Sequence, residues 1–156
     1  MTRARHSAWI RAKRRHLVEI RRRPFRYARL CLAVRTWALL IPVLVPKDAA
    51  LARLLARTAP GSGRPYAGLS VDTIRRCCRK AVRRPLLMAD RPCLREGLLL
   101  NRFLVMAGYA PVLHFGVDRA SLSQPDVRAH CWITLGAQVI NPPEPTMVEI
   151  FEHRSA

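Results

Sequence analysis

Apolar residues recur at helical spacing through the first two thirds of the chain, in segments bounded by residues that start or stop helices. Ser70 is a favourable N-cap, and Pro85 ends the amphipathic pattern that follows it. Gly108 ends the last helical pattern, which opens with Pro92 in its first turn. The predicted helices run up to residue 23 and over residues 25–41, 49–57, 70–84 and 92–105.

Beyond Pro111 the pattern changes to the short alternating runs that are typical of strands. Strands are predicted over 112–117, 129–135 and 138–140, the last two joined by a tight turn at residues 136–137. Alternation places His130, Trp132 and Thr134 on one face, and Cys131 on the opposite, inward face. Helices followed by an antiparallel sheet indicate an α+β domain, in which the helix that starts near residue 92 packs on a small sheet.

Charge is distributed very unevenly along this pattern. The net charge is +18, of which residues 1–35 contribute +11 and residues 36–90 contribute +7, whereas residues 91–156 are neutral. A strong positive field attracts nucleic acid, anionic lipid or an acidic partner without specifying which of them binds. We therefore expect a basic helical region over 1–64, suited to docking a partner, and a separate core domain over 65–156.

The cysteine content and the N-terminal segment predict a reducing, cytoplasmic setting. Five cysteines are an odd number, no secretory signal is evident, and Pro42 interrupts the apolar run 37–45. Residues 30–45 contain Arg35 as well as Pro42 and are a poor membrane span. A helix packed on its own domain or on a partner is favoured over association with a membrane surface, which stays open. No cofactor or metal is expected, because no Cys-x-x-Cys spacing accompanies the cysteines and histidines.

Three residues of the neutral half have the order of a papain-type site. Cys93 lies at a predicted helix start, where the peptide dipoles favour the thiolate form of its side chain. His130 lies 37 residues further on in a predicted strand, and the hairpin brings Asn141 back beside it. Cys, His and Asn then supply the nucleophile, the base and the group that orients the base for acyl transfer.

Each of these residues also has an ordinary structural interpretation. A cysteine in a helix is more often a small core residue, as we expect for Cys31, Cys77 and Cys78, and a strand histidine such as His114 is more often structural. Two other functions therefore stay open. One is a docking subunit without activity, and the other is a nucleic-acid-binding protein that acts through its charge alone.

A set of short motifs resembles the transglutaminase-like cysteine peptidases of bacterial lasso peptide biosynthesis. The matching stretches are Arg91-Pro92-Cys93-Leu94, Gly108-Tyr109, Phe115-Gly116-Val117, Ala129-His130-Cys131-Trp132, Gly136 and Val139-Ile140-Asn141. The family usually has Asp at the third catalytic position, where this chain has Asn141. Asp118 and Asp126 precede the His130 strand and are less favoured as third members.

The resemblance implies a papain- or transglutaminase-like core and a function in peptide maturation. Enzymes of this family cut the N-terminal leader from a ribosomally made precursor peptide, through residues that correspond to Cys93, His130 and Asn141. A chain of this length resembles the split form, in which a separate leader-recognition protein delivers the precursor. The macrolactam-forming cyclase that uses the freed amine is a further expected partner.

Overall fold

The computed structural model describes residues 17–18, 21–44, 50–61, 63–83, 92–124, 127–142 and 145–155. The helices are α2 (Pro24–Leu44), α3 (Leu51–Thr58), α4 (Val71–Val82) and α6 (Pro92–Val105). The strands are β1 (Val112–Asp118), β2 (Ala129–Leu135), β3 (Gln138–Val139) and β4 (Met147–Arg154), and a 3₁₀ turn, η1, covers Arg119–Ser121. The predicted first helix lies largely outside the described residues, and Asp126, one of the less favoured third members, lies wholly outside them.

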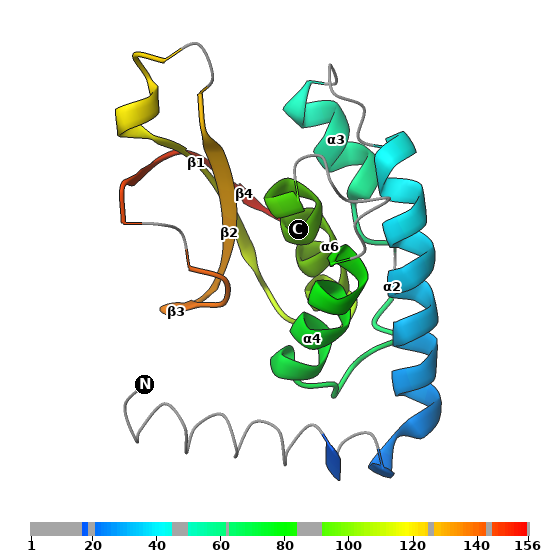
Figure 1. The fold of residues 1–156 in the computed structure, drawn as a ribbon. Coiled ribbons are helices and arrows are strands. Elements are labelled where there is room, and N and C mark those ends of the chain that lie inside the picture. The colour runs from blue at the N-terminus through cyan, green and yellow to red at the C-terminus, as the bar shows by residue number, and fades with distance from the viewer. Residues whose placement is uncertain are drawn as a thin grey trace.

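The described strands form one antiparallel sheet in the order β3-β2-β1-β4. The helices lie together on one side of this sheet, with α6 between the sheet and α2 (Figure 1). This arrangement confirms the predicted α+β fold, including the packing of the helix that carries Cys93 on a small sheet.

Strand β4 was not predicted from the sequence. It pairs with β1 along its length, and a register shift occurs between Phe115 and Gly116. The strand forms the edge of the sheet, and Ile150 on it is 64% exposed. Its side chains show no alternation of buried and exposed positions, which explains why the sequence pattern did not reveal it.

Local sequence explains where α4 begins and where α6 ends. The Ser70 side chain accepts the backbone N–H of Thr73 at 3.3 Å, as expected of an N-cap. After α6, Gly108 adopts a φ of 89°, a left-handed conformation that glycine takes without steric cost. The chain reverses there and enters β1, so this turn connects the end of α6 to the sheet.

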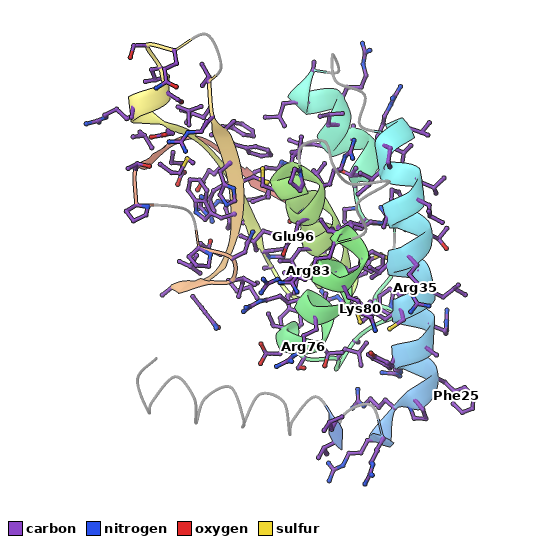
Figure 2. All side chains as sticks on the ribbon, viewed as in Figure 1. Phe25, Arg35, Arg76, Lys80, Arg83 and Glu96 are labelled. Atoms are coloured by element: carbon purple, nitrogen blue, oxygen red, sulfur yellow. The ribbon has the colours of Figure 1, made fainter. Side chains whose placement is uncertain are left out.

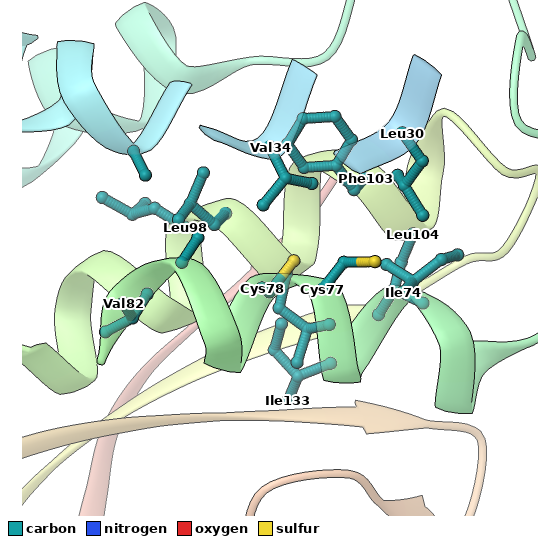
Figure 3. Packing of buried hydrophobic residues seen from close by; sticks show 14 of the residues in the cluster. Leu30, Val34, Ile74, Cys77, Cys78, Val82, Leu98, Phe103, Leu104 and Ile133 are labelled. Carbon is teal, nitrogen blue, oxygen red and sulfur yellow. The ribbon is translucent and has the colours of Figure 1, made fainter. Parts of the chain in front are cut away.

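One hydrophobic core joins the helices to the inner face of the sheet. Figure 3 shows Leu30 and Val34 of α2 above Cys77 and Cys78 of α4, with Ile133 of β2 on the far side of α4. The other large side chains of this core that are almost fully buried are Ile41, Leu69, Ile74, Leu98, Leu99, Leu100, Phe103, Leu104 and Leu113. Helices α2 and α3 share the core with α4 and α6, and the predicted division near residue 64 stays a prediction.

Helix α2 has two different faces. Leu30, Val34, Ala38 and Ile41 are buried in the core, which agrees with the favoured prediction of a helix packed on its own domain. By length and mean hydropathy, α2 is also the one helix in the described part of the chain that could cross a membrane. Core helices of soluble domains pass the same test, and Pro42 lies inside this helix near its end.

Candidate active site

Cys93, His130 and Asn141 line one cavity of about 350 Å³ where the start of α6 meets the sheet. Cys93 is the second residue of α6, His130 is the second residue of β2, and Asn141 follows β3. The remaining lining residues are Arg75, Arg79, Pro92, Glu96, Ile140 and Pro142. The structure therefore brings together all three residues that the sequence singled out.

Both neighbours of His130 in the chain contact Cys93. The Sγ atom of Cys93 lies 3.8 Å from the backbone oxygen of Ala129, and the Sγ atom of Cys131 lies 2.9 Å from the backbone oxygen of Cys93. These two contacts hold the start of α6 against β2 at the level of His130. Cys131 points inward, as alternation predicted, and is 1% exposed.

The Cys93 thiol has a strongly lowered pKa, from 9.0 to about 5. The largest cause is a hydrogen bond from the Cys131 thiol, followed by a hydrogen bond from His130 and its charge, while burial opposes the shift. The pKa of Cys131 is raised well above 9.0 by its interaction with Cys93 and by burial. Of the two neighbouring sulfur atoms, Cys93 therefore loses its proton first and Cys131 keeps its own.

The predicted direction of the Cys93 shift is confirmed, although its main source differs from the one expected. The sequence pointed to the helix dipole as the cause of the lowered Cys93 pKa. In the structure, the largest contribution to this shift comes from a second thiol, Cys131 on β2. A glycine makes this contact feasible, because a Cβ atom on Gly97 would lie 2.6 Å from the Cys131 sulfur. Gly97 thus allows Cys131 to approach the helix one turn beyond Cys93.

Asn141 makes contacts other than those predicted. Its amide oxygen accepts the backbone N–H of Ile133 at 2.8 Å, and its amide nitrogen donates to the backbone oxygen of Cys131 at 3.4 Å. Within the described residues, no hydrogen bond joins this amide to the His130 ring. Among the described residues, the group predicted to orient the base thus bonds to the strand backbone and not to the imidazole.

Glu96 is the acid that sequence reasoning overlooked. It lies one helical turn beyond Cys93, lines the same cavity, and interacts electrostatically with His130. Burial raises its pKa, while Arg79, Arg75 and Arg83 oppose that effect. Glu96 is three residues from Cys93 on the predicted helix, and this spacing already indicated that the two side chains lie on the same face. Asp118, the alternative weighed from the sequence, is instead buried against Arg128 and the N–H of Ala120.

A second thiol also has a lowered pKa. Cys31 on α2 lies 3.4 Å from the sulfur of Cys77, and this contact is the main reason that its pKa falls to about 6. It lines a cavity with the cationic residues Arg35, Arg76 and Lys80, which are labelled between α2 and α4 in Figure 2. Among the described residues, no histidine lines that cavity, so none of them offers Cys31 the proton-transfer partner that Cys93 has.

One group of side chains on the outer face of the sheet could hold a metal ion. The ligand atoms of His114, Glu149 and Glu152 lie within 4.8 Å of one another. The His114 ring already has partners for both nitrogens, Glu149 at 3.0 Å and Thr134 at 2.9 Å, and it stacks on Trp132. These contacts satisfy the ring without an ion and agree with the predicted structural role of His114.

Residues 36–154 match the family model of the transglutaminase-like superfamily. The chain belongs to this superfamily. No curated protein and no solved structure matches the chain. The superfamily includes cysteine peptidases, and the match covers the Cys93 helix, the His130 strand and the segment that carries Asn141. The match begins at residue 36, within α2.

Proposed function

We propose that this protein is a cysteine peptidase that removes the leader from a ribosomally made precursor peptide of the lasso type. The observation that carries the proposal is the low-pKa thiol of Cys93 beside His130 in one open cavity. Membership of a superfamily that includes cysteine peptidases supports the chemistry. The motif resemblance around Cys93, His130 and Asn141 supports the choice of substrate.

In the proposed reaction, the Cys93 thiolate attacks the carbonyl carbon of the scissile peptide bond. A backbone N–H of the first turn of α6 has no helical acceptor and can donate to the oxyanion that forms. The imidazolium of His130 gives its proton to the departing amine, which leaves a thioester on Cys93. His130 then takes a proton from water, and the resulting hydroxide releases the leader as a carboxylic acid and restores the thiolate.

Asn141 acts in this scheme as a positioning residue. Its amide bridges the backbone of Ile133 and Cys131, and Cys131 is the residue that follows His130 on the strand. The amide thereby fixes the strand that presents the base, whereas the imidazolium interacts with the carboxylate of Glu96. Loss of Asn141 should therefore reduce folding stability together with activity.

The proposed setting is the cytoplasm, with a separate leader-recognition protein and the macrolactam-forming cyclase as partners. The outward face of α2 supports a docking role for this part of the chain. Phe25 is 84% exposed and points away from the other elements in Figure 2, and Leu32 and Val43 are 68% and 76% exposed. Basic residues flank these side chains, so an acidic partner or an anionic membrane surface would be complementary to this face.

The experiment is to incubate the protein with a candidate lasso precursor peptide, with and without a candidate leader-binding protein, and to weigh the products. We expect two fragments whose masses sum to the precursor plus one water molecule. Cys93→Ala should remove the cleavage, while Cys78→Ala, at a thiol buried in the core, should retain it. Cleavage by folded Cys93→Ala would refute the mechanism, and no cleavage by any form would favour the docking subunit.

A further inference from the structure

The α4 side of the Cys93 cavity is strongly basic. Arg75 and Arg79 are four residues apart, lie on the same face of α4, and both line the cavity. Arg83, the residue that follows α4, also acts on the carboxylate of Glu96 of α6, and both residues are labelled in Figure 2. The nucleophile of the proposed reaction therefore shares its cavity with two guanidinium groups, those of Arg75 and Arg79.

These positive charges are only partly balanced. The carboxylate of Glu96 lies 3.9 Å from the Arg79 guanidinium, which is a loose ion pair. Among the residues that the structure describes, Arg75 has no salt-bridge partner. Arg75 and Arg79 thus place two guanidinium groups beside the single carboxylate of Glu96 in this part of the cavity lining. The cavity wall consequently has a net positive charge and one guanidinium available to a ligand.

We propose that Arg75 and Arg79 form a carboxylate-binding wall that receives an acidic side chain of the substrate next to the scissile bond. This inference rests on the proposed peptidase function, because it names the class of peptide that the site takes. A guanidinium presents paired N–H donors in a plane, which matches the two oxygens of a carboxylate. Ile140 and Pro142 line the same cavity and supply apolar contacts for the peptide chain.

The test uses two alkylating reagents of nearly the same size, iodoacetate and iodoacetamide, on the full-length protein. In each reaction the Cys93 sulfur displaces iodide and forms a carbon–sulfur bond, and the reagents differ mainly in the charge of the carboxylate. Both react with the same thiolate, so the ratio of their rate constants cancels any change in the Cys93 pKa. The rate constants are measured from mass spectra of the peptides that contain each cysteine. The ratio of the two rate constants at each cysteine is then compared with the same ratio for a free thiol.

We expect the iodoacetate-to-iodoacetamide ratio at Cys93 to exceed the free-thiol ratio by about threefold to tenfold at low salt. Arg75→Gln should remove most of this preference, and Arg79→Gln should remove part of it. The preference should also shrink in 0.5 M salt, because both guanidiniums are partly exposed to solvent. Arg76→Gln is the matched control, since Arg76 lines the cavity of Cys31 and should change the ratio only there.

Two further variants test the sign and the nature of the effect. Glu96→Gln removes the competing carboxylate and should raise the iodoacetate preference of Cys93. Arg75→Lys retains the positive charge and should keep at least half of the preference. Comparison of Arg75→Lys with Arg75→Gln therefore distinguishes an effect of lost charge from an effect of disturbed folding. Equal ratios for Cys93 and a free thiol, or an unchanged ratio in an Arg75→Gln, Arg79→Gln double variant, would overturn the proposal.

These measurements do not require peptidase activity, so the two proposals can fail independently. An absent charge preference together with Cys93-dependent cleavage of a precursor would reject the carboxylate-binding wall alone. A clear preference that depends on Arg75, without any cleavage, would reject the peptidase function and leave Cys93 in an anion-binding cavity.

Discussion

Replacement of Cys131 by alanine should raise the pKa of Cys93. In the wild-type protein the pKa of Cys93 is about 5, and a hydrogen bond from the Cys131 thiol is its largest cause. Alanine has no donor, so the Cys93 thiolate would keep only the support of His130 and of a backbone N–H. We expect an upward shift of about one to two units, because a lost hydrogen bond to a charged group has effects of this size.

The size of the wild-type shift in the Cys93 pKa determines which quantity the experiment must measure. At pH 7 a thiol with a pKa of 5 is about 99% ionised, whereas a thiol with a pKa of 9 is about 1% ionised. A less basic thiolate is also a weaker nucleophile, with a Brønsted coefficient of about 0.4–0.5, which offsets most of this hundredfold gain. The absolute rate at pH 7 is therefore uninformative, and the midpoint of the pH profile is the diagnostic quantity.

The assay follows the reaction of Cys93 with iodoacetamide between pH 4 and pH 9, with the modified peptide quantified by mass spectrometry. The wild-type rate should be constant above about pH 6 and should fall as the pH drops through 5, where the thiolate becomes protonated. In Cys131→Ala the fall should begin at higher pH. Cys31, with a pKa of about 6, is an internal reference that should not move.

Cys78→Ala is the control for general loosening of the core, because Cys78 is fully buried on α4 and does not line the Cys93 cavity. Its Cys93 profile should match that of the wild-type protein. A wild-type midpoint near 9, or an identical midpoint in wild type and Cys131→Ala, would refute the argument that Cys131 stabilises the Cys93 thiolate.

Two further predictions concern the stability of the site, measured as the free energy of unfolding in denaturant. Gly97→Ala should destabilise the fold by about 1–3 kcal/mol, because its Cβ would lie 2.6 Å from the Cys131 sulfur. Gly61→Ala, where a Cβ meets nothing within 4 Å, is the matched control, and equal losses in both variants would contradict the contact. Asn141→Ala should cost about 1–3 kcal/mol by leaving the Ile133 N–H unpaired. Asn141→Asp keeps the acceptor and should cost less, so the reverse order would argue against a bridging role.

Local patterns in the sequence predicted most elements of this fold. The Ser70 cap fixed the start of α4, and strict alternation placed Cys131 inward on a strand whose bounds, 129–135, match those of β2. Helix caps and strand alternation depend only on residues that are close together in the sequence. Strand β4 lacks them, because an edge strand with mostly exposed side chains has no periodic burial for a pattern to reveal.

The same limit applies to the candidate site. The order of Cys93, His130 and Asn141 was visible in the sequence, and the structure places all three around one cavity. The hydrogen bond from Cys131 was not predictable, since alternation gives the face of a strand but not the helix that packs against it. The approach of Arg75 likewise depends on how α4 lies against α6, which is a tertiary property.

The most direct test of the Cys93–His130 pair is the cleavage rate of a precursor peptide by Cys93→Ala, His130→Ala and the double variant. Groups that act as one catalytic unit are strongly non-additive when they are removed. We predict that His130→Ala lowers the rate by at least about a hundredfold, and that the double variant is no slower than Cys93→Ala alone. Cleavage by His130→Ala at the wild-type rate, or losses that multiply in the double variant, would contradict the account.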